Sequence, residues 1–285
     1  MTSITDILQF SKVRLTTSVV FSALAGYFIA FDKFDVFTFT YLLLGGFLVV
    51  AASNGFNQIL EKEHDKLMER TADRPLPTGR MSVREAFWLS LVMSLVGIFL
   101  LYRINFLSGF FGTLSIILYV LVYTPLKRIS PVSVFVGAFP GAIPFMLGWV
   151  AATNDFDVEP GILFAIQFIW QFPHFWAIAW VCDDDYKRAG FKMLPGEKDK
   201  STAWKTVIYC FFLIPLSILP VFGITGSLQL SVLAAILIVV LGIWFTMKAI
   251  QLFKKVDDAS AKKLMFASFI YLPLLQLIYI IDRLL

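Results

Sequence analysis

The chain has 285 residues, of which 58% are hydrophobic and 15% are charged, and its formal net charge is +4 at pH 7. Soluble domains contain about 25% charged residues, so the composition and a mean hydropathy of +0.78 exclude an ordinary soluble domain. Basic residues are interleaved with acidic ones along the sequence, and we therefore expect no nucleic-acid partner.

Several stretches are long and apolar enough to cross a membrane as helices, each of which takes roughly 20 residues. In chain order they are about Leu15–Phe31, Phe37–Gly55, Ala86–Leu101, Phe106–Pro125, Val132–Ala152, Ile162–Val181, Thr206–Ile224, Leu230–Ala249 and Met265–Ile281. Proline and glycine inside some stretches are compatible with spans, because packed neighbours can satisfy the freed backbone groups. We expect a single all-α, polytopic membrane domain over residues 1–285, a bundle of nine transmembrane helices.

Basic residues are distributed unevenly between the two ends of these spans. All but three of the 24 Lys and Arg residues lie at the N-terminus or in the connections after the second, fourth, sixth and eighth spans. The exceptions are Lys33, Arg103 and Arg283. The positive-inside rule therefore predicts a cytoplasmic N-terminus and a C-terminus outside.

The first charged cluster follows the second span. Asn57, Glu61 and Asp65 are four residues apart, so on a helix they share one face. Oxygen-bearing side chains in such a row suit Mg²⁺, which takes a few carboxylates and completes its shell with water and substrate phosphate. The alternative is a solvated helix end that is held by ion pairs with neighbouring lysines.

Two arginines follow directly. Arg70 and Arg74 are again four residues apart, and "RPLP" at 74–77 predicts that the helix ends after Asp73. Arginine forks bind phosphate oxygens in bidentate fashion, so acids beside arginines indicate a diphosphate site. The chain contains no GxxxxGK[ST] motif, which argues against a P-loop nucleotide site.

Further basic residues follow the fourth span, in "YTPLKR" at Tyr123–Arg128. Lys127 and Arg128 lie on the same predicted side as the first cluster. They are either part of the diphosphate site or ordinary anchors at the membrane surface.

The sixth span contains Gln167, Gln171 and His174, whose spacing predicts one polar stripe on a helix. Asp185 lies eleven residues after His174, so a continuous helix would carry the stripe on to this acid. Polar groups at such depth generally face a cavity or the bundle interior. The alternative is that these side chains only bridge helices.

The motifs resemble those of a known family. "NQILEKEHDKLMERTADRPLPTGR" at Asn57–Arg80 is similar to the first signature of the UbiA-type intramembrane prenyltransferases. "YTPLKR" and "WQFPHFWAIAWVCDDDYKRAGFKMLP" at Trp170–Pro195 resemble signatures of the branch that farnesylates protohaem IX. The resemblance extends from about Lys12 to Pro195. In this pattern the acid before tyrosine is the expected one, which favours Asp185 over Asp183 and Asp184.

The resemblance implies a helical bundle around a lipid-accessible cavity, with farnesyl diphosphate and haem b as substrates, haem O as product and Mg²⁺ as cofactor. It implies metal ligation by Asn57, Glu61, Asp65 and Asp185, with Arg70, Arg74 and Lys127 completing the catalytic set. The residues implied in substrate binding are Lys12, Tyr123, Arg128, Gln171, His174 and Tyr186.

The same resemblance implies a location in the bacterial cytoplasmic (inner) membrane. The partners that it implies, besides membrane lipid, are haem A synthase or a terminal-oxidase assembly factor. Two alternatives remain open at this point. One is a prenyltransferase that acts on a quinone precursor or another lipid acceptor, and the other is a transporter of a phosphate-bearing solute.

Overall fold

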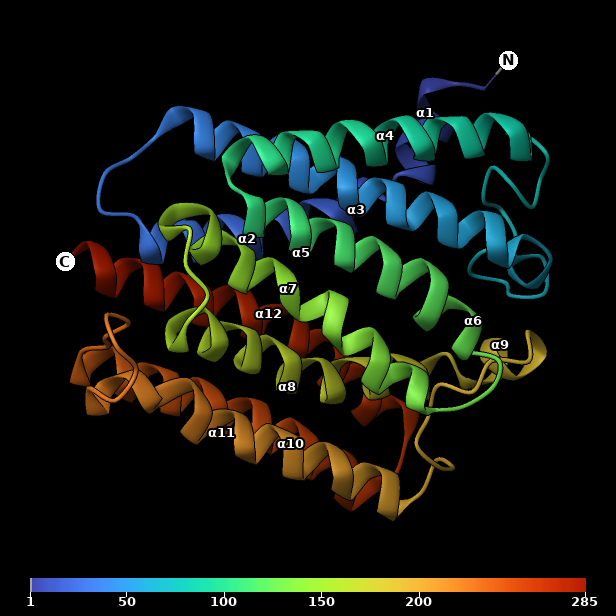
Figure 1. The fold of residues 1–285 in the computed structure, drawn as a ribbon. Helices are drawn as coiled ribbons and strands as arrows, with labels where there is room; N and C mark the ends of the chain where they lie inside the picture. Colours follow the sequence, from blue (N-terminus) through green and yellow to red (C-terminus); the bar gives the residue numbers. More distant parts are fainter. Residues whose placement is uncertain (1) are drawn as a thin grey trace.

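The computed structural model describes residues 2–285, and all regular structure within them is helical (Figure 1). Nine helical runs in this part of the chain are long and apolar enough to span a membrane. They are α2 (Val13–Ala30), α3 (Val36–Asp65), α4 (Val83–Ile104), α5 with η1 and α6 (Phe106–Leu126), α7 (Val132–Thr153), α8 (Val158–Val181), α10 with η2 (Lys200–Phe222), α11 (Val232–Lys255) and α12 (Asp258–Leu284). The prediction of an all-α protein with nine candidate spans is confirmed.

Polar caps decide where several spans begin. Asp35 accepts hydrogen bonds from the N–H groups of Phe37 and Thr38 at the start of α3. Ser82 and Glu85 form a reciprocal capping box at the start of α4. Such caps satisfy amide groups that have no partner inside the helix, so the helix starts are encoded locally.

The helices run along a common direction, and the chain connections gather at the two ends of the bundle (Figure 1). One end carries α1 (Ile4–Phe10), the connection 66–82, α6 (Thr124–Leu126) and α9 (Asp183–Arg188), and we call it the charged end. The C-terminus lies at the opposite end. Helix α7 lies at the centre and packs against α2, α5 (Phe106–Ile117) and α8.

Helices α2 and α7 cross at very short range. A Cβ atom added to Gly148 would overlap the carbonyl oxygen of Ala23, and one added to Gly26 would overlap the carbonyl oxygen of Phe145. Small residues at such crossings let membrane helices pack backbone against backbone. This contact fixes α2, whose first turn follows Lys12, against the central helix.

One predicted helix end is wrong, and one expected helical continuation is interrupted. Helix α3 ends at Asp65 and not after Asp73, because the connection turns back over the helix end, where Thr71 Oγ1 donates to the Asp65 carbonyl at 2.8 Å. Helix α8 ends at Val181, and Cys182 (φ −102°, ψ 17°) separates it from α9. The expected continuous helix from Gln167 to Asp185 is therefore interrupted before it reaches the acid.

Helix α1 was not anticipated by the apolar pattern. It begins with a capping box formed by Ser3 and Asp6, and its last residue, Phe10, is fully buried. Gln58 of α3 donates to the Phe10 carbonyl at 2.6 Å, and Arg80 pairs with Asp6 at 2.8 Å. These contacts dock α1 onto the charged end.

Candidate active site

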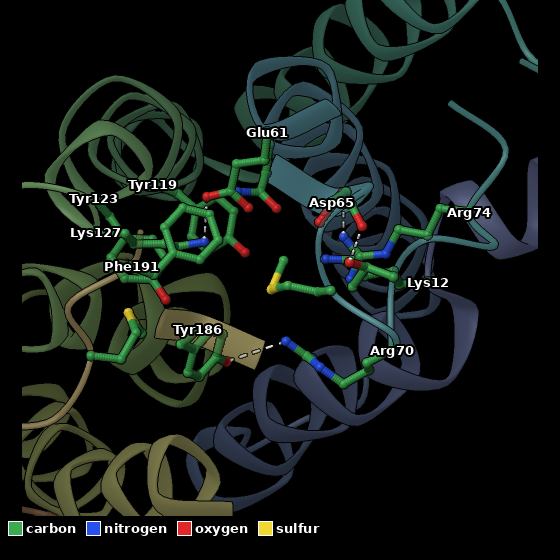
Figure 2. A pocket seen from close by; sticks show the side chains of 14 residues that line it. Lys12, Glu61, Asp65, Arg70, Arg74, Tyr119, Tyr123, Lys127, Tyr186 and Phe191 are labelled. Carbon is green, nitrogen blue, oxygen red and sulfur yellow. Dashed lines mark hydrogen bonds and ion pairs between the residues drawn. The ribbon is translucent and has the colours of Figure 1, made fainter. Parts of the chain in front are cut away.

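A cavity of about 110 Å³ opens at the charged end, between the ends of α3 and α6 and the segments around Lys12 and α9 (Figure 2). Most of the site residues predicted from the sequence line it: Lys12, Asn57, Glu61, Asp65, Arg70, Arg74, Tyr123, Lys127 and Tyr186. Met68, Thr71, Tyr119, Phe191 and Met193 complete the lining. The structure thus brings together groups that are separated by more than a hundred residues in sequence.

The last turns of α3 supply a row of oxygen donors. Asn57, Glu61 and Asp65 are all buried, and their spacing places them on one face of the helix. The Asn57 amide donates from Nδ2 to Thr124 Oγ1 at 3.1 Å, which leaves its carbonyl oxygen as an acceptor. Asp65 accepts from Arg74 through Oδ2 at 2.7 Å, whereas its buried Oδ1 has no hydrogen-bond partner among the described residues.

Basic groups face this row across the cavity. Lys127 Nζ lies 2.9 Å from Glu61 Oε1 and 4.6 Å from the centre of the Tyr123 ring. Burial acts to lower the pKa of Lys127, but the charge and hydrogen bond of Glu61, together with the hydroxyls of Tyr119 and Tyr186, act in the opposite direction, and the pKa is raised above its usual value. Arg70 reaches the Tyr186 hydroxyl at 3.4 Å, beside the face of that ring. The ammonium group of Lys127 and the guanidinium group of Arg70 therefore face the same cavity, where both can bind an anion.

Lys12 enters the cavity from a strained backbone position. Its φ of 46° and ψ of 52° are left-handed, a region that costs an L-residue other than glycine roughly 1–2 kcal/mol. Burial of its ammonium group, and then the positive charges of Arg74 and Lys127, lower the pKa of Lys12 well below its usual value. Strain of this kind points to function rather than to folding.

The donor set fits a hard divalent cation. The cavity offers an amide oxygen and two carboxylates, one of which, Asp65, has a buried oxygen with no partner. Among residues 2–285 no three His, Cys, Asp or Glu side chains form a self-contained metal cluster. Amide and carboxylate oxygens are donors that Mg²⁺ accepts, and this ion commonly takes its remaining ligands from water and from substrate phosphates.

Asp185 and Arg128 are not brought to the cavity. Asp185 Oδ1 accepts the Glu69 N–H at 3.3 Å and pairs with Arg188. Arg128 is exposed and donates to His64 Nε2 at 3.0 Å. The contact between Glu69 and Asp185 nevertheless confirms that the two acidic clusters lie at the same end of the bundle.

The polar side chains that were expected to form one stripe on α8 contact two different neighbouring helices. The prediction of one shared stripe is therefore wrong. Gln167 and Gln171 donate to carbonyl oxygens of α7, those of Gly141 and Ala138, both at 2.9 Å. His174 instead contacts Ser268 of α12. The two glutamines bridge helices, and neither Gln171 nor His174 lines the cavity.

His174 has a defined tautomer. The Ser268 hydroxyl donates to the Met265 carbonyl at 2.6 Å, so it can only accept from His174 Nδ1, which lies 2.8 Å away. The proton of the neutral ring is then on Nδ1, and Nε2 keeps its lone pair. The ring stacks on Trp170 at a centroid distance of 4.4 Å and is only partly buried.

Sequence reasoning missed part of the cavity wall. Tyr119 precedes Tyr123 by four residues, a spacing that could have revealed it. Both rings belong to η1 (Leu118–Tyr123), a π-helical turn of the kind that often occurs at functional sites. Phe191 and Met193 lie in an irregular segment after α9, where no periodic signal exists.

The chain is similar in sequence to known proteins. Residues 19–271 match the UbiA prenyltransferase family. The protoheme IX farnesyltransferase of Christiangramia forsetii is 53% identical over 281 residues, which cover 98% of this chain and 94% of that protein. The protoheme IX farnesyltransferase of Flavobacterium psychrophilum is 53% identical over 282 residues, with the same coverage.

Solved structures share the fold. A structure of digeranylgeranylglyceryl phosphate synthase superposes with a TM-score of 0.82 at 21% identity and covers 99% of both chains. A UbiA homologue from Archaeoglobus fulgidus bound to GPP and Mg²⁺ superposes with a TM-score of 0.74 at 15% identity, over 96% of this chain and 99% of that one.

Proposed function

The chain belongs to the UbiA prenyltransferase family, and on this premise we propose that it transfers a farnesyl group from farnesyl diphosphate to a vinyl group of haem b, which yields haem O. The observation that carries the proposal is the cavity at the charged end, where a row of oxygen donors on α3 faces four basic side chains. The close relatives named protoheme IX farnesyltransferase support haem b as the acceptor.

The basic side chains bind the diphosphate. Arg70 and Arg74 offer planar forks that match phosphate oxygens, and Lys127 and Lys12 add two point charges from other walls. Negative charge accumulates on the diphosphate as its bond to the allylic carbon breaks. Preorganised cations therefore stabilise the transition state more than the bound substrate.

Asn57, Glu61 and Asp65 would hold Mg²⁺ against the same diphosphate. A bound Mg²⁺ supplies Lewis-acid neutralisation of the leaving group. The role of Asp185 as a further ligand remains a prediction, because its carboxylate is engaged by Arg188 and by the Glu69 N–H.

Aromatic side chains would surround the reacting carbon of the bound substrate. Tyr119, Tyr123 and Phe191 line the cavity beside Lys127, and ring faces stabilise an adjacent cation. Departure of the diphosphate leaves an allylic cation, and the haem vinyl group bonds to it through its terminal carbon. Water then adds to the remaining vinyl carbon and releases a proton, which completes a hydroxyethylfarnesyl group.

His174 serves the acceptor. Its Nε2 lone pair is left unprotonated by the Ser268 contact, and a histidine whose other nitrogen is anchored in this way suits ligation of haem iron. The ring is part of the α8–α12 surface and is separate from the diphosphate cavity, as two substrates require.

The N-terminus and the charged end face the cytoplasm of a bacterial cell, and the C-terminus lies outside. The distribution of lysine and arginine supports this orientation. The acids and cations then meet a water-soluble diphosphate head group and Mg²⁺ at the aqueous surface, while the prenyl chain stays among apolar side chains and lipid.

The test is an assay of the purified protein in detergent with haem b, farnesyl diphosphate and Mg²⁺, with the pigment analysed by mass spectrometry. We expect a haem that has gained one farnesyl group and one hydroxyl group. Asp65→Asn, which keeps the side-chain shape, is the matched inactive variant. Prenylation of a quinone precursor but not of haem b, by folded protein, would contradict the proposed acceptor.

A further inference from the structure

One wall of the cavity belongs to no helix. The segment 189–193, here called the wall segment, has Ala189, Phe191 and Met193 buried at 2%, 6% and 5% exposure, and the last two line the cavity. Gly190 turns the chain with a φ of 73°. Only its first two residues bond back to α9, through the Ala189 N–H to the Asp185 carbonyl and the Gly190 N–H to the Lys187 carbonyl. The position of the rest depends on the few contacts that hold it.

Two of these contacts are made by its own backbone. The Phe191 N–H donates to the Tyr186 carbonyl at 2.8 Å, within the turn that ends α9. The Lys192 N–H donates to the Lys127 carbonyl at 2.7 Å and ties the segment to the end of α6. Neither contact reaches α3, which carries the oxygen donors on the opposite wall.

The link to α3 is His64. Its Nδ1 lies 3.0 Å from the Ala189 carbonyl oxygen, and its ring packs against Phe191 at a centroid distance of 5.5 Å. Its Nε2 lies 3.0 Å from Arg128 Nη1. A carbonyl only accepts and a guanidinium only donates, so one neutral ring with its proton on Nδ1 satisfies both contacts. His64 is thus held from two sides.

We propose that His64 is a positioning residue, which holds the wall segment against α3 and so keeps water away from the allylic carbon of the bound prenyl diphosphate. The inference rests on the proposed function. A closed wall allows only the acceptor to trap the cation. With the wall loosened, a water oxygen bonds to the same carbon and loses a proton to solvent, and farnesol forms instead of prenylated haem.

The experiment measures how consumed farnesyl diphosphate divides between farnesol and prenylated haem. His64→Phe keeps an aromatic ring beside Phe191 but removes both nitrogen contacts, and we expect a several-fold rise in the farnesol fraction. Arg128→Gln, at an exposed position, should raise it in the same direction by less. Lys66→Ala is the control, because it breaks only the exposed pair with Glu63 and should leave the division unchanged.

A purely structural role for His64 predicts a different result. The melting temperature would fall and both products would decrease together, at an unchanged ratio, which would overturn the inference. If His64→Phe does not fold, Arg128→Gln decides the question. An unchanged farnesol fraction in Arg128→Gln would then overturn the inference. Failure of the wild-type protein to consume farnesyl diphosphate would instead contradict the proposed function, so the two failures can be told apart.

Discussion

The pair formed by Asp65 and Arg74 allows structural and catalytic roles to be separated. The Asp65 side chain is fully buried and that of Arg74 is 16% exposed, with 2.7 Å between Oδ2 and Nη1. Arg74→Gln leaves a buried carboxylate whose other oxygen already has no partner. Removing one member of a buried pair costs about 3–5 kcal/mol, and we expect about 3 because glutamine can still donate one hydrogen bond.

Asp65→Asn should be milder. The asparagine oxygen still accepts from Arg74, so only the charge assistance is lost, at about 1 kcal/mol. The double variant replaces the ion pair with two amides that can bond to each other, and its cost should be about 1–2 kcal/mol. The two changes are then coupled by roughly 2–3 kcal/mol, well above the limit expected for independent sites.

The assay is thermal unfolding of the four proteins in one detergent, combined with turnover. At roughly 2–4 °C per kcal/mol for a chain of this size, Arg74→Gln should melt about 6–12 °C below the wild type, and the double variant should recover roughly one to two thirds of this loss. All three variants should lose turnover relative to the wild type, because each lacks a contact to the diphosphate or to the metal. Melting of Arg74→Gln at the wild-type temperature would refute the reasoning and show that Asp65 needs no counter-charge.

Other predictions concern single residues. Lys12→Gly should keep or slightly raise stability, because relief of ~1 kcal/mol or more of left-handed strain offsets the chain entropy of glycine, while binding of farnesyl diphosphate, measured by titration, weakens at least tenfold. His174→Ala should weaken haem binding in a spectroscopic titration and leave farnesyl diphosphate binding unchanged; equal loss of both would indicate a packing role. Cysteines introduced at Thr78 and Lys198 should both be labelled from the cytoplasmic side, and labelling from opposite sides would contradict the proposed orientation.

Long-range periodicity made most of the fold predictable. Apolar runs of membrane length specify the spans, and the four-residue spacing of Asn57, Glu61 and Asp65 places them on one face of α3 without knowledge of any partner. Where the chain leaves regular structure, the same reasoning failed. Helix α3 stops at Asp65 because the connection folds back through Thr71, a contact that no periodic pattern encodes.

The assignment of α8 failed for a related reason. Spacing on an ideal helix places Gln171 and His174 on one face, but it does not specify which neighbour each will meet. In the bundle Gln171 finds a carbonyl of α7 and His174 finds Ser268 of α12. Likewise Phe191 reaches the cavity through a turn at Gly190 that follows a helix break. Tertiary partners, and not local preference, decide these positions.

The docking of α1 has a practical consequence for purification. The Phe10 side chain is fully buried in the bundle, and Asp6 is paired with Arg80. Both residues lie shortly before Lys12 in the sequence, and Lys12 lines the cavity. An affinity tag joined directly ahead of Ser3 would disturb the cap that starts α1, and with it the docking of α1 that precedes Lys12. Leu285 is fully exposed at the far end of the bundle. A purification handle therefore belongs after Leu285, where immobilisation on resin would leave the diphosphate entrance unobstructed.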